Sequence, residues 1–270
     1  MNAEARPLTV LDLVGMKAAG RRIVMLTCYD AVFARLLEQA GVDVLLVGDS
    51  LNQVLAGHET TLSATLDQMI YHAAAVRRGS RRALVFVDLP FLTYQVSIPD
   101  AIRNAGRVLQ ETGAHGVKLE GGRHMTETVG ALVERGIPVM GHLGLTPQSV
   151  HALGGYRVQG RDDPSADRLL ADAKALEAAG ACAIVLELIP AAVAARISQA
   201  LTVPTVGIGA GGQCDGQVLV LHDMLGLNEQ FAPRFLKHYA KLGDAVRSAV
   251  QSYASEVRDK KYPGKEHSFE

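Results

Sequence analysis

Cysteine is scarce in this chain, which has three among 270 residues, Cys28, Cys182 and Cys214. They are scattered and form no Cys-x-x-Cys pair. This pattern argues against a disulfide framework and against a thiolate metal site. The reduced cytoplasm is therefore the expected location.

A charge excess and long apolar runs are also lacking. The 27 Lys and Arg residues nearly balance the 28 Asp and Glu residues, so no net field favours nucleic acid or an anionic membrane surface. No run approaches the length of a transmembrane helix, and residues 1–7 lack the apolar stretch of a signal peptide. We expect no nucleic-acid or membrane partner.

What the sequence does contain is a series of short apolar runs that end on residues able to do chemistry. Each run is rich in Val, Ile and Leu, and helical-looking sequence separates most of them, which predicts buried parallel strands. Residues 22–27, 203–209 and 217–222 read as three further strands. The eight predicted strands indicate one α/β domain over residues 1–270, a (β/α)8 TIM barrel. The runs with a reactive residue are 42–50, 83–90, 116–121, 137–144 and 182–190.

Helical spacing of apolar residues predicts an extra helix before the barrel, over 9–19, and one or two helices after it, over 232–257. The latter belong to a C-terminal extension of about 232–270. Two long stretches, 51–63 and 146–164, are predicted to be irregular. The second is expected to cover or border the open face of the barrel. The helices expected between strands cover 29–40, 66–78, 99–112, 125–135, 166–179 and 191–200.

Three carboxylates, Asp49, Asp88 and Glu120, follow consecutive predicted strands. The C-terminal ends of barrel strands meet at the face where active sites form. Carboxylates that converge there favour a cation, and oxygen ligands favour Mg2+ or Mn2+ over zinc. We assign Asp49 and Asp88 to the metal, with Glu120 acting through water. The alternative is that each acid caps a helix or loop.

Lys118 and Glu120 are two residues apart, so both side chains are expected to point into the barrel. They could form a structural ion pair instead of a site. Glu187 alternates with Ala183 and Val185 and should also face inward, partly desolvated and more basic than a free carboxylate. It is the candidate general base for a weakly acidic C–H. The alternative is a Glu bonded to backbone amides.

His142 and Ser50 carry weaker signals. His142 could bind a substrate oxygen or exchange a proton, although a lone His is more often structural. Ser50 could contact an anion or cap a helix. Gly207, Gly209 and Gly212 match the dinucleotide pattern Gly-x-Gly-x-x-Gly, but the next predicted strand begins too soon for a phosphate-binding helix. NAD binding is not supported.

Taken in order, these segments closely resemble the ketopantoate hydroxymethyltransferase family, from about residue 8 to the C-terminus. The resemblance rests on the combination, since no single segment is specific. The segments are Met25-Leu-Thr-Cys-Tyr-Asp30, Val47-Gly-Asp-Ser50, Val87-Asp-Leu-Pro-Phe91, Val117-Lys-Leu-Glu-Gly-Gly122, Gly141-His-Leu-Gly-Leu-Thr-Pro-Gln148, Gly207-Ile-Gly-Ala-Gly211 and Asp215-Gly-Gln-Val-Leu219.

The resemblance implies a Mg2+-dependent barrel that transfers a hydroxymethyl group from 5,10-methylenetetrahydrofolate to 3-methyl-2-oxobutanoate. The product would be 2-dehydropantoate, on the route to pantothenate and coenzyme A, and the enzyme would often be a homodecamer. By matching positions, Asp49 and Asp88 would bind Mg2+ and the 2-oxo acid, and Glu120 would support the metal. Ser50 and Lys118 would contact the substrate oxygens. His142 would lie beside the substrate.

In this interpretation, Mg2+ and Lys118 stabilise the enolate that forms when Glu187 removes the C3 proton. One departure from the family is Leu51-Asn52-Gln53, where relatives commonly have a nearby Gly. Three other readings remain open. One is a Mg2+-dependent carbon–carbon lyase of the isocitrate lyase and phosphoenolpyruvate mutase type. Such lyases often have a mobile loop with a Cys after a barrel strand, and residues 51–63 contain no Cys. The others are a Schiff-base aldolase using Lys118 and a barrel that only binds a small acid.

Overall fold

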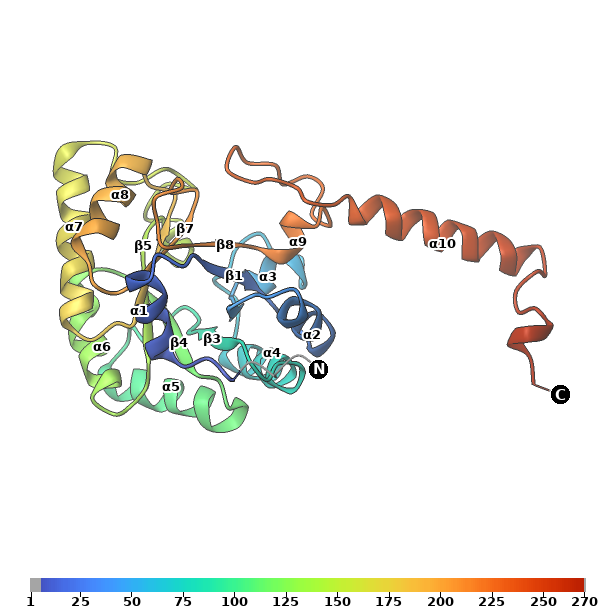
Figure 1. Cartoon of the computed structure of the whole chain (residues 1–270), viewed down its shortest axis with the longest axis horizontal. Coiled ribbons are helices and arrows are strands. Elements are labelled where there is room, and N and C mark those ends of the chain that lie inside the picture. Colours follow the sequence, from blue (N-terminus) through green and yellow to red (C-terminus); the bar gives the residue numbers. More distant parts are fainter. Residues whose placement is uncertain (1–5, 270) are drawn as a thin grey trace. The chain divides into compact units, whose positions relative to one another are not determined.

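A computed structural model describes residues 6–269 and has a closed barrel of eight parallel strands at its centre (Figure 1). Each strand pairs in parallel with its neighbours in sequence, and β8 pairs with β1 to close the ring. The predicted TIM barrel is confirmed. The strands are β1 (Ile23–Thr27), β2 (Val44–Val47), β3 (Leu84–Asp88), β4 (Gly116–Glu120), β5 (Val139–Gly144), β6 (Ala183–Glu187), β7 (Thr205–Ile208) and β8 (Gly216–Leu219).

Helices connect most of the strands and surround the barrel (Figure 1). Two further helices, α9 (Leu221–Met224) and α10 (Leu242–Arg258), follow β8. The expectation that residues 1–7 are not part of a signal peptide concerns mainly residues 1–5, which lie outside the described range. The helices up to β7 are α1 (Val10–Ala18), α2 (Ala31–Gln39), α3 (Leu51–Val54), α4 (Leu66–Gly79), α5 (Ile98–Thr112), α6 (Thr126–Val133), α7 (Asp163–Ala178) and α8 (Ala191–Ala200).

Side chains at the helix ends explain why these helices begin and stop where they do. The Asp30 carboxylate accepts hydrogen bonds from the amides of Val32 and Phe33 at the start of α2, at 2.7 and 2.9 Å. Ser97 accepts from the amide of Asp100 at the start of α5. Gly113 ends α5 in a left-handed conformation, with φ of 69°. Each cap satisfies a backbone group that the helix leaves free.

The barrel interior near the starts of the strands is filled with apolar side chains, and Leu13 and Met16 of α1 join this core. Because these α1 residues pack with Ile23, Leu84 and Ala183 near the strand starts, α1 covers the N-terminal end of the barrel. The buried acids Asp88 and Glu120 end their strands at the opposite end of the barrel. The strand residues of the core are Ile23, Met25, Val44, Leu46, Leu84, Phe86, Met140, Ala183, Val185, Val206 and Val218.

Three sequence-based expectations were wrong in detail. Residues 51–63 are not wholly irregular, because α3 occupies their first turn. The eighth strand ends at Leu219, where its pairing with Leu26 of β1 ends, and Leu221–Met224 is helical. Helix α7 begins at Asp163 rather than residue 166, since Asp162 caps it by accepting from the Ser165 amide at 2.8 Å.

The last expected helix was also partly wrong, because residues 232–241 are not helical. Their end is held by backbone bonds to an earlier turn. The Tyr239 amide donates to the Met224 carbonyl at 2.8 Å, and the Leu242 amide donates to the Leu225 carbonyl at 2.9 Å. Tertiary hydrogen bonding therefore overrides the helical spacing of this segment.

The chain divides after Leu219 into two compact units. The expectation that all 270 residues form one domain stays a prediction. In the second unit, α10 has 17 residues and none of them is buried. Its apolar residues Val246, Val250, Tyr253 and Val257 recur at helical spacing and are exposed. This helix therefore presents an uncovered apolar stripe.

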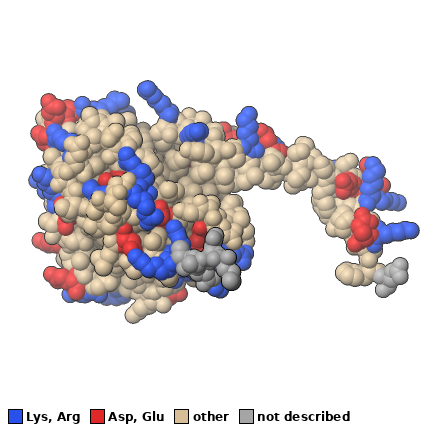
Figure 2. Space-filling view, in the orientation of Figure 1, with Lys and Arg blue, Asp and Glu red and all other residues tan. Residues whose placement is uncertain are grey.

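Basic and acidic side chains lie close to one another across the face of the barrel that Figure 2 shows. Several of them form exposed pairs, such as Arg107 with Glu111 at 2.8 Å and Arg123 with Asp172 at 2.8 Å. Such pairs contribute little to stability. None of the helices described between residues 6 and 269 has the length and hydropathy of a membrane-spanning segment.

Candidate active site

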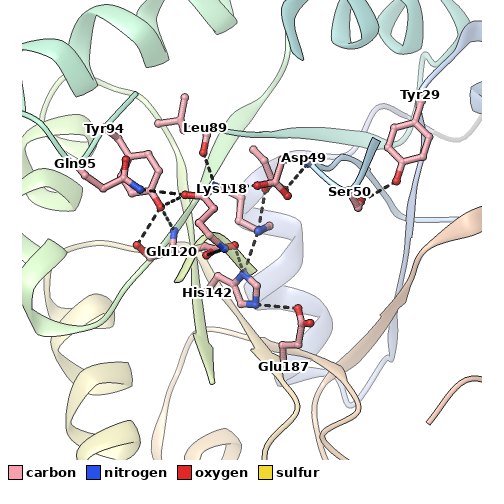
Figure 3. Close-up of polar contacts among 12 residues, drawn as sticks. Tyr29, Asp49, Ser50, Leu89, Tyr94, Gln95, Lys118, Glu120, His142 and Glu187 are labelled. Atoms are coloured by element: carbon pink, nitrogen blue, oxygen red, sulfur yellow. Dashed lines mark hydrogen bonds and ion pairs between the residues drawn. The ribbon is translucent and has the colours of Figure 1, made fainter. Parts of the chain in front are cut away.

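Polar side chains gather at the C-terminal ends of β2 to β6, inside the barrel. The strand register aligns Asp88 with Lys118 and Glu120 with His142. With Asp49, which follows β2, these residues are at most 6% exposed. Figure 3 shows the group, with His142 between Lys118 and Glu187. Alternation along each strand thus turns charged residues into the site and apolar residues away from it.

Asp88 links two strands through its two carboxylate oxygens. Oδ1 lies 2.9 Å from Lys118 Nζ, and Oδ2 accepts a hydrogen bond of 3.0 Å from the Asp49 amide. The ion pair of Lys118 is therefore with Asp88 rather than with Glu120. Both partners are only 5% exposed at the side chain. A buried pair of this kind is costly to break, because either charge would be left alone in a poorly polar environment.

His142 connects the ammonium of Lys118 to the carboxylate of Glu187. Its Nδ1 lies 3.1 Å from Lys118 Nζ and its Nε2 lies 3.2 Å from Glu187 Oε2. Burial and Lys118 lower the pKa of His142, but Glu120 and Glu187 outweigh them and raise it to about 9. Nδ1 also lies 3.5 Å from Glu120 Oε1, so a carboxylate faces each ring nitrogen of His142.

The carboxylates outnumber the positive charge around them, and Asp49 shows the effect. Its burial, followed by repulsion from Asp88 and Glu120, raises the pKa of Asp49 to about 8. Lys118 and a hydrogen bond from Gln148 oppose that rise. At neutral pH the site therefore favours taking up either a proton or a cation at Asp49.

Two predicted site residues have surroundings that the sequence did not indicate. Ser50 does not cap α3; its Oγ lies 2.8 Å from the hydroxyl of Tyr29. The Glu187 side chain is 18% exposed, compared with 3% for His142. It is thus the most accessible acid of the group, as a base that must reach a substrate should be.

Sequence analysis missed Gln148 and Tyr94 as members of the site. Gln148 donates from Nε2 to Asp49 Oδ2 at 2.9 Å, and its amide donates to Glu120 Oε2 at 3.0 Å. The Tyr94 hydroxyl donates to Gln148 Oε1 at 2.8 Å. Both residues lie on connecting segments, where no strand periodicity indicates direction. For Gln148, the one available signal was its place in the segment Gly141–Gln148.

The residues departing from the family pattern after Ser50 tie their own loop together. Asn52 is fully buried and donates to the Thr60 carbonyl at 2.7 Å and to Ser63 Oγ at 2.9 Å. Gln53 donates to the hydroxyl of Tyr156 at 3.2 Å. The segment 51–63 is therefore internally hydrogen-bonded and linked to the segment after β5.

The donor set fits a hard divalent cation bound by few protein ligands. Asp49 and Asp88 supply carboxylate oxygens, and burial together with repulsion from neighbouring acids raises the pKa of Asp49. Among residues 6–269, no three His, Cys, Asp or Glu side chains are arranged to hold a metal together. Mg2+ commonly takes one or two carboxylates and completes its shell with water. The residues fit such an ion and do not form a complete protein cage.

The glycine-rich turn after β7 lacks the helix that a dinucleotide site requires. β7 ends at Ile208 and β8 begins at Gly216, with no helix between them. A pyrophosphate in the Gly-x-Gly-x-x-Gly arrangement would need that helix N-terminus. The structure thus agrees with the interpretation that this match is coincidental.

Comparison with known proteins identifies the family. The family model described as ketopantoate hydroxymethyltransferase matches residues 7–265. The chain belongs to this family. A 3-methyl-2-oxobutanoate hydroxymethyltransferase of Syntrophus aciditrophicus is 53% identical over 99% of this chain and 98% of the relative. One from Desulfotalea psychrophila is 55% identical over 97% of this chain and 94% of the relative.

Some solved structures share the fold of this member of the ketopantoate hydroxymethyltransferase family at low sequence identity. Phosphoenolpyruvate phosphomutase from Streptomyces platensis has a TM-score of 0.63 at 15% identity, covering 94% of this chain and 88% of that one. A phosphonopyruvate hydrolase in complex with oxalate and Mg2+ has a TM-score of 0.62 at 13% identity, covering 96% and 93%. At such identities the likeness does not extend to the reaction.

Proposed function

We propose that this enzyme transfers a hydroxymethyl group from 5,10-methylenetetrahydrofolate to 3-methyl-2-oxobutanoate and forms 2-dehydropantoate, a step of pantothenate synthesis. The observation that carries the proposal is family membership over nearly the whole chain, at 53% identity to a named hydroxymethyltransferase. The buried residues Asp49, Asp88, Lys118 and Glu120, with the part-buried Glu187, add chemical support, because a barrel that only bound an acid would not need them.

Mg2+ is proposed as the resident cation, held by Asp49 and Asp88 with Glu120 acting through water. Such an ion would polarise the carboxylate and keto oxygens of the 2-oxo acid. Support comes from the all-oxygen donor set and from the surroundings of Asp49, where burial, followed by repulsion from Asp88 and Glu120, raises its pKa to about 8. The Ser50 hydroxyl would contact the same substrate oxygens.

Proton removal is assigned to Glu187. It would take the proton from C3 of the oxo acid, and the electron pair of that bond would move onto the keto oxygen. The Lys118 ammonium would stabilise the negative charge that develops there. His142 would lie beside the substrate and orient Glu187 through its Nε2, which lies 3.2 Å from Oε2.

The carbon nucleophile formed in this way would attack the methylene carbon of the folate. A C3–carbon bond would form, both bonds from the methylene carbon to the folate nitrogens would break, and water would supply the hydroxyl. The C3 proton and one proton of that water would end on the two nitrogens, which gives tetrahydrofolate. C3 becomes quaternary.

Lys118 is paired with Asp88 at 2.9 Å. Burial lowers the pKa of Lys118, but Asp88 and Glu120 outweigh burial and raise it. A charged amine is a poor nucleophile, which disfavours a Schiff base on Lys118.

The deciding experiment is an assay with 3-methyl-2-oxobutanoate, methylenetetrahydrofolate and Mg2+, with and without a chelator. We expect 2-dehydropantoate only when both substrates and the cation are present. A carbon–carbon lyase of the phosphoenolpyruvate mutase type, which the shared fold keeps as the second candidate, would instead cleave a 2-hydroxy or 2-oxo acid without folate. Lack of product with every divalent metal would contradict the proposal.

Assembly into a homo-oligomer, and specifically a decamer, is proposed as part of the same function. The support is the exposed apolar stripe of α10, formed by Val246, Val250, Tyr253 and Val257. Such a face is stabilised when a second copy covers it. A cytoplasmic location is proposed as well, and the three cysteines are all free, as that compartment favours.

A further inference from the structure

The side-chain amide of Gln148 uses its full hydrogen-bonding capacity inside the site. Nε2 donates to Asp49 Oδ2 at 2.9 Å and to the Leu89 carbonyl at 3.0 Å. Oε1 accepts from the Tyr94 hydroxyl at 2.8 Å and from Gln95 Nε2 at 3.0 Å. Both neighbours of Nε2 are acceptors and both neighbours of Oε1 are donors. The amide can therefore face only one way.

The main chain of Gln148 reaches a second acid of the same site. Its amide donates to Glu120 Oε2 at 3.0 Å, and the Glu120 amide in turn donates to the Tyr94 hydroxyl at 3.0 Å. Gln148 is 6% exposed and Tyr94 is 1% exposed, so water does not compete for these bonds. One residue of the segment after β5 thus holds carboxylates that follow β2 and end β4.

Orientation of these acids needs an external restraint. Asp49 is repelled by Asp88 and Glu120, and its burial leaves no solvent to screen that repulsion. A neutral amide can fix one oxygen of Asp49 without adding a positive charge that would compete with a cation. A Lys or Arg in the same place would neutralise the site.

We propose that Gln148 is a positioning residue that holds the carboxylates of Asp49 and Glu120 ready for a divalent cation. The proposal rests on the proposed function, because it takes the Asp49–Asp88 pair as the cation site. Tyr94 acts through Gln148, since its hydroxyl fixes Oε1 and leaves Nε2 directed at Asp49. Residues that orient metal ligands in this way typically contribute about 10- to 100-fold to metal affinity.

The test measures binding of Mn2+ alone, without either substrate, from the electron paramagnetic resonance signal of the free ion. Wild type is compared with Gln148→Leu, which removes both side-chain donors, and with Gln148→Met, which keeps the length of the side chain, adds no charge and cannot donate a hydrogen bond to Asp49. We expect Mn2+ to bind about 10- to 100-fold more weakly to both variants. The spectrum of bound Mn2+ should also change, which a merely structural role would not cause.

Gln159→Leu is the matched control. Gln159 lies on the same connecting segment and its side chain bonds only to the Arg157 carbonyl, at 2.9 Å. Its Mn2+ affinity should equal that of wild type. Tyr94→Phe provides a second route, because it leaves Gln148 in place and removes the hydroxyl that orients it. We expect a smaller weakening of Mn2+ binding than in Gln148→Leu.

The outcomes separate the two proposals. If wild type binds no Mn2+, the cation site of the proposed function fails, and this inference fails with it. If wild type binds Mn2+ and the folded variants bind it equally well, only the role of Gln148 is overturned. Thermal unfolding identifies folded variants. Should Gln148→Leu not fold, unchanged binding by Gln148→Met and Tyr94→Phe overturns the role in the same way.

Discussion

At the scale of single residues, the site is a group of acids short of positive charge. Four acids, Asp49, Asp88, Glu120 and Glu187, surround the two basic residues Lys118 and His142. A cation or a proton must supply the missing positive charge. Burial, followed by repulsion from Asp88 and Glu120, raises the pKa of Asp49 to about 8. Protonation and metal binding at this site are therefore linked.

The first prediction concerns pH and stability of the metal-free protein. The pKa of Asp49 is about 8 in the fold against 3.8 for a free group. Because the folded value is higher, the stability that protonated Asp49 contributes is complete below about pH 4 and is lost as pH rises through 8. The melting temperature should fall between pH 5 and pH 9.

Excess Mg2+ should reduce this fall, because the ion binds the ionised carboxylate. Asp49→Asn, which cannot ionise, should show a flatter pH profile and little response to Mg2+. Differential scanning calorimetry at pH 5, 7 and 9 measures all three. A metal-free wild type as stable at pH 9 as at pH 5 would contradict the assignment.

The second prediction concerns Glu187. Glu187→Gln keeps the shape of the side chain but has no basic oxygen, so it should bind 3-methyl-2-oxobutanoate and lose exchange of the C3 proton in deuterated water. We expect exchange to slow by about 10²- to 10⁴-fold. Nuclear magnetic resonance follows the exchange. Glu134→Gln is the control, since Glu134 is 80% exposed, and undiminished exchange in Glu187→Gln would exclude Glu187 as the base.

The direction of a side chain could be predicted from sequence where the residue lies on a strand. Lys118 and Glu120 could be assigned to the barrel interior because strand geometry fixes the direction of alternate side chains. Gln148 and Tyr94 could not, since they lie on connecting segments whose conformation depends on distant contacts. The ion pair between Lys118 and Asp88 was also not predicted, because it depends on the register between β3 and β4.

At the scale of elements, the eight strands and most helices were predictable. Short apolar runs and clear capping residues mark them, such as Asp30 before α2 and Gly113 after α5. The start of α7 was missed, although Asp162 and a following Pro are typical of a helix N-terminus. Residues 232–241 could not be predicted, since backbone bonds to residues 224 and 225 decide their conformation.

The third prediction concerns the end of β5, where Gly144 has φ of 94°. A Cβ atom there would lie 2.1 Å from the Glu187 carbonyl oxygen. Gly144→Ala should therefore displace the end of β6 and with it the proposed base. We expect a lower free energy of unfolding and a lower kcat.

Gly136→Ala is the matched control, because Gly136 also has a left-handed φ, of 75°, but no atom lies within 4 Å of its added Cβ. It should cost about 1–2 kcal/mol of strain and leave kcat unchanged. Urea unfolding and steady-state kinetics compare the pair. Equal effects of both substitutions on kcat would show that the contact with β6 does not matter.

At the scale of the whole molecule, the uncovered stripe on α10 leads to the fourth prediction. Val250→Asp places a charge in the middle of the stripe, where Val250 is 59% exposed in a single chain. If copies associate through this face, the substitution should shift the mass measured by light scattering to a smaller assembly, because the buried charge would be unpaired.

Ser248→Asp adds the same charge to the same helix, about 160° around its axis from Val250 at 100° per residue. It should leave the assembly unchanged. A wild type that is monomeric at all concentrations would contradict the proposed oligomer. An unchanged mass for Val250→Asp would show that the stripe on α10 is not the contact surface.

The closure of the barrel has a consequence for how such a molecule meets its neighbours. Because β8 pairs with β1, the sheet formed by residues 23–219 has no free edge. Another chain cannot extend it by adding a strand, which is a common route to fibrils and to peptide capture. Recognition of other proteins is therefore left to helices and loops, where side chains rather than backbone groups decide which partner fits.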